Sequence, residues 1–219
     1  QMDNYVIFDS YISSDDFHLL LYKEADKTPE QVRSSVTIPG MHGKLDMTYA
    51  LTDEPIFSNR NVTYSFYIDA MYGADDYQHV IDDMRNKLHG HEMIVKPSSH
   101  LGWHLKANVS VGDYDIEDDT GTVNVSCDCF PFYLRNSMTT RSYTVEDNET
   151  HEFIIMNSAM WAVPEITTTA SMTVEIDGTS VTLSKGTTKN AGIIIRSGTR
   201  KIRITGKGTM TFKWQEGML

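Results

Sequence analysis

The sequence predicts a mainly β protein with one α-helix, divided into two domains. Three observations predict this fold class. Apolar and polar residues alternate with a period of two along most of the 219 residues, and one window instead repeats its apolar residues at intervals of three and four. In addition, the net charge and the residue pattern both change near residue 135. A chain of this length can bury a sizeable core without disulfides or metals.

The period-two segments are expected to be half-buried strands, because successive strand residues point to opposite faces of a sheet. Clear examples are Val62–Ile68, Met93–Lys96, Val123–Val125 and Ile202–Ile204. After residue 142 such segments recur at short spacing, with turn signals such as Ile176-Asp-Gly178 between them. This spacing predicts an all-β sandwich in residues 143–219.

One helix is expected within residues 74–89. Its apolar residues are spaced by three and four, which places them on one helix face. Asp75 and Asp76 supply an N-terminal cap, and Gly90 follows the expected end. A shorter helix is expected from Met47 to Leu51.

The distribution of charge supports two domains. The formal net charge is -11, but residues 1–134 hold 9 Lys and Arg against 22 Asp and Glu, whereas residues 135–219 hold 10 against 8. The polar run Asn136–Ser142 interrupts the strand pattern. We therefore predict a first domain in residues 1–134, a linker in 135–142 and a second domain in 143–219. The acidic first domain is not expected to bind a phosphate backbone.

The stretch Gly40-Met-His-Gly43-Lys44 has the glycines of a phosphate-binding or nucleic-acid-binding loop. A P-loop needs four residues between its glycines and Ser or Thr after the lysine, whereas here two residues intervene and Leu45 follows. A KH-type loop joins helices, but this stretch joins strand-like segments. A turn fits better, with Pro39 at the second position and Gly40 at positive φ.

Other chemical motifs are incomplete. His100 and His104 have zinc-helix spacing, but Leu101 stands where the catalytic Glu would be and Gly102 disfavours a helix. Residues 113–121 are expected to form a hairpin tip around Asp118–Gly121 rather than a calcium loop. We expect no catalytic residue, metal site or cofactor. Cys127 and Cys129 are expected to be buried thiols, and a late basic cluster is expected on a solvated strand face: Arg196, Arg200, Lys201, Arg203 and Lys207.

A series of short motifs nevertheless occurs in a specific order within residues 15–134. Val36-Thr-Ile-Pro-Gly40 is followed by Gly43-Lys-Leu-Asp-Met-Thr48 and Phe57-Ser-Asn-Arg60, and then Leu88-His-Gly90 precedes Cys129-Phe-Pro-Phe-Tyr133. This series resembles the distal tail (Dit) proteins of bacteriophages with long, non-contractile tails and of related prophages. Members of that family have Arg-Asp where this sequence has Met41-His42.

The resemblance implies that residues 1–134 form a ring or belt domain and residues 143–219 a galectin-like β-sandwich. It implies a structural, non-enzymatic role in the virion. A homo-hexameric ring at the distal end of the tail would join the tail tube protein to the tail hub or tail-associated lysin and hold receptor-binding proteins. Genomic DNA would pass through the lumen without specific binding. The family motif falls on Pro39, Gly40, Gly43, Leu45, Asp46, Arg60, Gly90 and Pro131.

An alternative is a carbohydrate-binding β-sandwich from a glycan-binding or sugar-processing protein, in which Trp161 or Trp214 stacks on a sugar ring. The alternation of both tryptophans with apolar neighbours instead favours core positions for them. We expect no membrane span, because the sequence lacks an apolar run of about 20 residues. We expect no signal peptide, because no basic n-region is followed by an apolar core. Synthesis is expected in the cytoplasm of the host bacterium.

Overall fold

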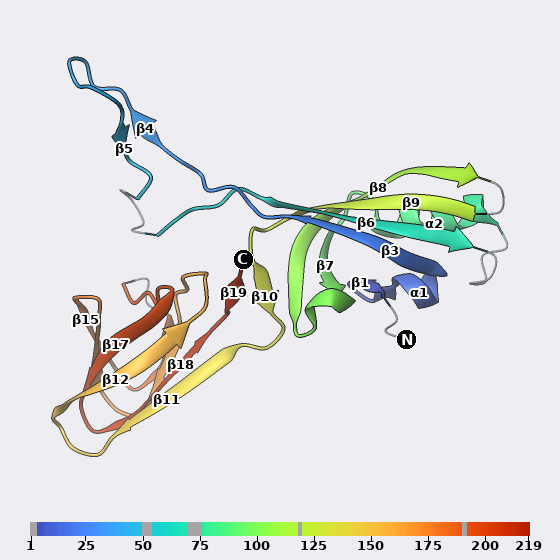
Figure 1. The fold of residues 1–219 in the computed structure, drawn as a ribbon. Coiled ribbons are helices and arrows are strands. Elements are labelled where there is room, and N and C mark those ends of the chain that lie inside the picture. The colour runs from blue at the N-terminus through green and yellow to red at the C-terminus, as the bar shows by residue number, and fades with distance from the viewer. Residues whose placement is uncertain (1–3, 50–53, 70–75, 118–119, 190–191) are drawn as a thin grey trace. The chain divides into compact units, whose positions relative to one another are not determined.

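The computed structural model describes residues 4–49, 54–69, 76–117, 120–189 and 192–219, which are rich in strands and contain one long helix (Figure 1). The expected mainly β fold class is confirmed. The chain divides into two compact units, Gln1–Tyr133 and Leu134–Leu219. Each unit has its own buried hydrophobic residues, and strand β10 (Tyr133–Arg135) spans the division.

The first unit is built on an antiparallel sheet, here called the large sheet, whose strands lie in the order β2-β1-β7-β8-β9-β6-β3. β8 and β9 form a hairpin in which Glu117 pairs with Thr120. The hairpin expected around residues 118–121 is therefore present, although Asp118 itself lies outside the described residues. The strands are β1 (Val6–Phe8), β2 (Tyr11–Ile12), β3 (Leu19–Lys27), β6 (Arg60–Asp69), β7 (Glu92–Pro97), β8 (Trp103–Glu117) and β9 (Thr120–Cys129).

The core of the first unit follows from the period of two. In β6, the alternate residues Val62, Tyr64, Phe66 and Ile68 are all completely buried, because every second side chain of a strand faces the same side. The expected strands Met93–Lys96 and Val123–Val125 likewise lie within β7 and β9. The sequence pattern therefore located these strands correctly.

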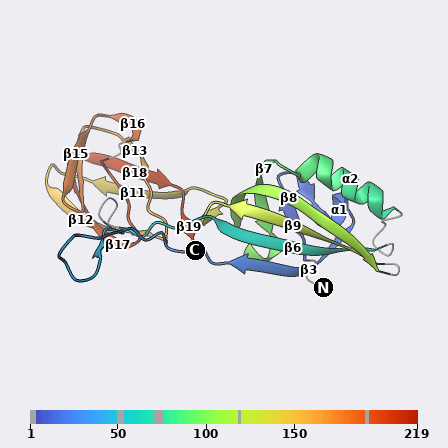
Figure 2. The same cartoon turned by 90° about the horizontal axis from the view of Figure 1, so that it is seen from above.

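Helix α2 (Tyr77–Leu88) covers part of this core beside β8 (Figure 2). Ile81, Met84 and Leu88 are completely buried, as the spacing of three and four predicts. Asp76 is the N-cap, and its carboxylate accepts hydrogen bonds from the N–H groups of residues 78 and 79. The other expected cap, Asp75, lies outside the described residues. At the other end Gly90 has a φ of 78°, which lets the chain leave the helix.

A short helix, α1 (Ser13–Asp16), precedes β3 and lies near the last turn of α2. The Lys87 ammonium lies 5.4 Å from the ring centroid of Tyr11 and 5.5 Å from that of Phe17. It also forms an ion pair with Asp83 at 2.7 Å, and the hydrogen bond to Asp83 raises the pKa of Lys87. This lysine therefore joins α2 to the segment around α1. The first unit also contains η2 (Ser98–His100).

The Gly40-Met-His-Gly43 stretch lies between strands β4 (Ser35–Val36) and β5 (Leu45–Asp46), which form a separate two-stranded sheet (Figure 1). Met41 N–H donates to the carbonyl of Ile38 at 3.1 Å, and Gly40 has a φ of 85°. These values fit a type II turn with Pro39 in its second position. The expected turn between strands is confirmed.

The helix expected from Met47 to Leu51 is wrong over residues 47–49. Met47 N–H donates to the carbonyl of Ser34 at 2.8 Å, which continues the ladder of the hairpin. The carboxylate of Asp46 accepts from Thr48 N–H at 2.9 Å, and this side-chain bond favours a turn over a helix. The Thr48 hydroxyl and N–H also lower the pKa of Asp46. Leu51 lies outside the described residues.

The second unit consists of two antiparallel four-stranded sheets. One sheet, here called the 11-18 sheet, has the order β11-β18-β13-β16, and the other has the order β12-β17-β14-β15. The expected strand Ile202–Ile204 lies within β17. The strands are β11 (Thr139–Val145), β12 (Thr150–Asn157), β13 (Glu165–Thr168), β14 (Met172–Ile176), β15 (Thr179–Leu183), β16 (Gly186–Lys189), β17 (Gly198–Thr205) and β18 (Gly208–Trp214), followed by β19 (Gly217–Met218).

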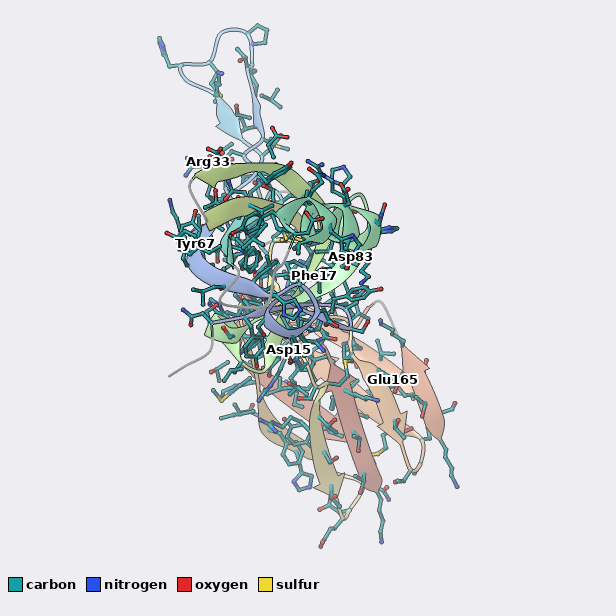
Figure 3. All side chains as sticks on the ribbon, turned by 90° about the vertical axis from the view of Figure 1, so that its right-hand side faces the viewer. Asp15, Phe17, Arg33, Tyr67, Asp83 and Glu165 are labelled. Atoms are coloured by element: carbon teal, nitrogen blue, oxygen red, sulfur yellow. The ribbon has the colours of Figure 1, made fainter. Side chains whose placement is uncertain are left out.

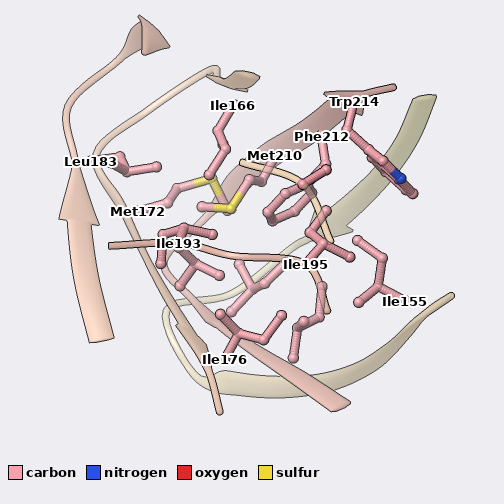
Figure 4. Packing of buried hydrophobic residues seen from close by; sticks show 14 of the residues in the cluster. Ile155, Ile166, Met172, Ile176, Leu183, Ile193, Ile195, Met210, Phe212 and Trp214 are labelled. Atoms are coloured by element: carbon pink, nitrogen blue, oxygen red, sulfur yellow. The ribbon is translucent and has the colours of Figure 1, made fainter. Parts of the chain in front are cut away.

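Side chains from both sheets meet in one apolar cluster, so the second unit is a β-sandwich (Figure 4). Ile166, Met210 and Phe212 come from the 11-18 sheet, and Ile176 and Ile155 from the other. Ile193 and Ile195 add apolar volume from the segment before β17. Because every second residue of these strands faces inward, the intervening residues form the two outer faces.

Strand β11 begins at Thr139, inside residues 135–142, which the sequence analysis assigned to a linker. Thr139 is buried opposite Trp214. The next residues, Thr140, Arg141 and Ser142, are exposed, because β11 is the edge strand of its sheet. Because this part of β11 has few inward-facing apolar residues, its sequence resembles that of a polar linker.

The turn at Gly40 gives a testable prediction. A Cβ at this position would meet nothing within 4 Å, so the φ of 85° is the source of strain for any larger residue. Gly40→Val should weaken the hairpin by about 1–2 kcal/mol, the usual penalty for a left-handed conformation. Amide exchange at Met41 should accelerate roughly tenfold. Gly40→Asn, which tolerates this conformation, is the control, and unchanged exchange in Gly40→Val would refute the turn.

Candidate functional site

The described residues contain no grouping of three or more His, Cys, Asp or Glu side chains that could hold a metal ion. Two of the histidines contact neighbouring groups in the first unit. The ring of His100 stacks on that of Tyr133 with centroids 4.4 Å apart, and Nδ1 of His89 accepts from Val111 N–H at 3.1 Å.

Both cysteines are free and buried, as expected. Cys129 Sγ lies 3.4 Å from the carbonyl oxygen of Cys127, to which it donates. The neighbouring Cys129 thiol and burial both raise the pKa of Cys127. The thiol of Cys127 is therefore protonated and unreactive.

Two of the late basic residues, Lys201 and Arg203, lie on a solvated strand face, as expected, whereas Arg196 and Lys207 lie outside the strands and Arg200 is half-buried. Lys201 and Arg203 of β17 are exposed, and both pair with Glu152 of the neighbouring strand β12, at 2.8 and 3.9 Å. Arg203 also lies 3.5 Å from Glu175 of β14. The carboxylates of Glu152 and Glu175 balance the charges of Lys201 and Arg203. This strand face is therefore not a basic footprint for nucleic acid.

Two residues of the family motif, Arg60 and Pro131, come into direct contact. Arg60 begins β6, and its side chain is only 4% exposed. Its Nε donates to the carbonyl of Pro131 at 3.0 Å. Its Nη1 lies 2.6 and 2.7 Å from the two carboxylate oxygens of Asp26 in β3. One guanidinium therefore joins two neighbouring strands to the segment that ends the first unit.

Tyr133 completes this arrangement, here called the Arg60 cluster: Asp26, Arg60, Pro131 and Tyr133. The guanidinium lies 4.9 Å from the centroid of the Tyr133 ring, and the Tyr133 hydroxyl donates to Asp26 at 3.1 Å. Burial and the charge of Asp26 raise the pKa of Tyr133, so its hydroxyl remains a donor. Nη2 of Arg60 has no hydrogen-bond partner among the described residues. The cluster can hold chain segments together, but it presents no reactive group to solvent.

The β4–β5 hairpin is unusual because large apolar side chains on it are exposed. Val36 and Leu45, which are cross-strand partners, are 50% and 41% exposed. Apolar side chains along the stem and turn of the hairpin are exposed as well. In the stem, Val32 N–H donates to the carbonyl of Ile56. The exposed apolar residues of this segment, here called the apolar arm (residues 30–49 and 54–58), are Val32, Val36, Ile38, Met41, Leu45, Met47, Tyr49 and Ile56.

The apolar arm also holds five residues of the family motif: Pro39, Gly40, Gly43, Leu45 and Asp46. Gly40 and Gly43 have φ values of 85° and 82°, and Asp46 caps the turn at Thr48. These residues shape the backbone of the arm, whereas the motif residue Leu45 contributes to its apolar surface. The motif residue Gly90 lies elsewhere, after α2, where its N–H donates to the carbonyl of Val109 at 2.8 Å.

The two candidate sugar-stacking residues differ in their environment. Trp214 is a core residue at 1% exposure, and its indole N–H donates to Asn157 at 2.9 Å. Trp161 is 42% exposed, so the core position that alternation favoured for it is wrong. The reason is local: residues 158–161 lie in a loop, not in a strand, so a period of two does not decide which residue is buried.

Sequence reasoning missed Asp26 and Asn157, which organise the Arg60 cluster and the Trp161 loop. A charged residue in an edge strand usually faces water, and nothing near Asp26 in sequence marks Arg60, 34 residues away, as its partner. Asn157 similarly ends β12 and resembles an ordinary turn residue. For Asn157 the sequence did contain a signal. Its amide directly follows an alternating strand and precedes Trp161, which is the position of a side chain that can bind the backbone of the next loop.

No model of a known protein family matches the sequence, and no curated protein matches it. Among solved structures, the chain is similar to the crystal structure of SPP1 Dit (gp 19.1), described as a paradigm of the hub adsorption apparatus in phages that infect Gram-positive bacteria. The TM-score is 0.67 at 13% sequence identity, and the match covers 97% of this chain and 98% of that chain.

The chain has a Dit-like distal tail protein fold. The match extends over nearly the full length of both chains, so it includes the large sheet and the β-sandwich. The resemblance read from the short motifs of residues 15–134 is thus confirmed at the level of the fold. Within the described residues, no helix has the length and apolar composition to span a membrane.

The Arg60 cluster predicts a large effect on stability. Arg60→Met removes a buried cation and leaves Asp26, whose side chain is 25% exposed, without its partner. Breaking a buried pair costs about 3–5 kcal/mol. Because Asp26 is partly exposed, we expect a loss of stability of about 3 kcal/mol. Tyr133→Phe should lower stability by about 1 kcal/mol, the value of one hydrogen bond.

Native-state hydrogen exchange of amides in β6 and β9 measures this loss for the first unit alone. Lys87→Met is the matched control, because it also removes a cation with an ion pair and ring contacts, but at a half-exposed position, and should cost about 1 kcal/mol. Equal effects of Arg60→Met and Lys87→Met would contradict the anchoring role of Arg60.

Proposed function

We propose that this chain is a distal tail protein, a structural component of the tail tip of a long-tailed phage. The observation that carries this proposal is the fold likeness to SPP1 Dit over nearly the full length of both chains. The motif order in residues 15–134 supports it independently, because motif residues shape the apolar arm and the Arg60 cluster. The function proposed is structural rather than catalytic.

The working form proposed is a homo-hexameric ring. The apolar arm supports assembly, because a two-stranded hairpin has no core of its own and is marginally stable in water. Contiguous exposed apolar surface is typical of sites that bind another protein. A contact between the arm of one copy and a different surface of the next is heterologous, and such contacts generate rings when the rotation closes.

In this proposal the ring joins the tail tube protein to the tail hub or tail-associated lysin and anchors receptor-binding proteins. The first unit makes the ring, because it contains the apolar arm and the family motif. The second unit, a sandwich with a core of its own, contributes little to the ring contacts. The protein then belongs to the virion, at the distal end of the tail, with genomic DNA in the lumen.

Assembly is tested with the full-length chain. Native mass spectrometry and negative-stain microscopy should show six copies in a ring at high protein concentration or on tail tubes. The double variant Val36→Asp with Leu45→Asp should shift the population toward monomer by at least tenfold. Two carboxylates at these cross-strand positions would have to be desolvated in the interface.

Thr37→Asp is the control, because this exposed residue lies next to Val36 in the same arm and adds a charge without replacing an apolar side chain. It should assemble nearly as the unmodified chain does. If the double variant still assembles normally, the arm is not the interface. If the unmodified chain remains monomeric even on tail tubes, the proposed function fails.

A lumen that DNA crosses should not bind DNA. Residues 1–134 hold 22 acidic against 9 basic residues, and like charge repels the phosphates. Fluorescence anisotropy with duplex DNA should detect no binding at physiological salt and protein concentrations up to the micromolar range. Salt-sensitive binding in that range would contradict the proposed lumen, because it requires a basic footprint.

A further inference from the structure

A pocket of about 440 Å³ opens beside Trp161 in the second unit. Trp161, Met138 and Met160 supply apolar surface, and Glu165, Lys189 and Lys213 supply charge. The volume lies in the range of roughly 300–1,000 Å³ that small-molecule sites occupy. An aromatic wall next to a few polar groups is the usual composition of such a site.

The three charged residues form a row across the outer face of the 11-18 sheet. Glu165 in β13 pairs in register with Lys189 of β16 on one side and with Lys213 of β18 on the other (Figure 3 labels Glu165). All three side chains are exposed. Among the ion pairs of the described residues, none involves these three side chains. The row therefore has a net charge of +1 and groups available to a ligand.

The loop that carries Trp161 is fixed from beneath by a buried side chain. Asn157 is 8% exposed, and its Nδ2 donates to the carbonyls of Met160 at 2.7 Å and Ile195 at 3.1 Å. Its Oδ1 accepts from the Trp214 indole at 2.9 Å. Ala162 and Ile195 exchange backbone hydrogen bonds of 3.0 and 2.8 Å. The wall of the pocket is thus held in place before a ligand arrives, which lowers the entropic cost of binding.

The surface next to the pocket is a row of hydroxyl groups. Two residues along each strand from the charged row, hydroxyl side chains lie side by side across the 11-18 sheet. They are Ser142, Thr211, Thr167 and Thr187. Ser142 and Thr211 are 2.8 Å apart at their hydroxyl oxygens, and Thr167 and Thr187 are 2.9 Å apart. Each hydroxyl can donate and accept, so this face can bind the hydroxyl groups of a chain that extends beyond the pocket.

We propose that this pocket binds a saccharide that bears an acidic group. The C–H face of a pyranose packs on an aromatic ring such as that of Trp161, which combines an apolar face with a polar edge. Glu165 accepts from ring hydroxyls, and Lys189 and Lys213 bind the carboxylate of the sugar through charge-assisted hydrogen bonds. The net positive row favours an acidic over a neutral sugar. This site lies in the sandwich alone, so it does not depend on ring formation or on the proposed tail function.

The test uses the full-length protein and two tetrasaccharides of matched length, tetragalacturonic acid and its uncharged counterpart galactotetraose. Isothermal titration calorimetry at low salt should show binding of the acidic sugar with a Kd at least tenfold below that of the neutral one. Trp161→Ala should weaken binding of the acidic sugar at least tenfold. Lys213→Gln should weaken it by several-fold and reduce the difference between the two sugars.

Matched controls lie on the outer face of the other sheet. Met156→Ala removes an exposed apolar side chain in β12, and Lys201→Gln removes an exposed lysine in β17, and neither should change either affinity. The thermal midpoint of each variant verifies folding, which exposed positions should leave intact. Absence of binding by both sugars, or unchanged binding by Trp161→Ala, would overturn the site. Equal binding of the two sugars would overturn the acidic class.

Discussion

The first unit depends on one buried cation. Arg60 stands where β6 begins, and its guanidinium binds the carboxylate of Asp26, the carbonyl of Pro131 and the face of Tyr133. Burying a charge is tolerated only when partners replace most of its lost hydration. These three partners belong to β3, to β10 and to the segment between β9 and β10. The path of the chain at the end of the large sheet is therefore set by the need to satisfy one side chain.

Among the described residues of the sandwich, no charged side chain is buried in the core. The sandwich depends on alternating apolar residues from two sheets, and the buried amide of Asn157 arranges the loop beside them. The buried polar groups of the two units therefore have different roles. In the first unit the buried polar group holds strands together, whereas in the second it holds an exposed aromatic residue in position. Asn157 thus fixes the loop in which the Trp161 side chain contacts solvent and the proposed saccharide.

Much of the fold could be predicted from the sequence, because its signals are local. The period of two located β6, β7, β9 and β17, and the spacing of three and four located α2 together with its cap Asp76. The turn at Gly40 was predictable because proline and glycine restrict their own dihedral angles. The errors arose where distant contacts decide. Residues 47–49 follow the ladder to Ser34 instead of forming a helix, and Asp26 is recognisable as a functional partner only when the strands are aligned. Trp161 and Trp214 look alike in sequence, but one belongs to a loop and the other to a strand.

Residues of the apolar arm are under two different constraints, one on the exposed side chains and one on the backbone of the turn. Its strands pair with each other and not with the large sheet, so its exposed side chains contribute little to the folding of their own chain. The turn glycines are different, because their dihedral angles are required whatever the arm contacts. This explains why Pro39, Gly40 and Gly43 match the family pattern, whereas the exposed Met41 and His42 replace the pair typical of the family. In the proposed ring, substitutions at those exposed positions must be matched by the surface of the neighbouring copy, so the arm and that surface are expected to evolve as a pair.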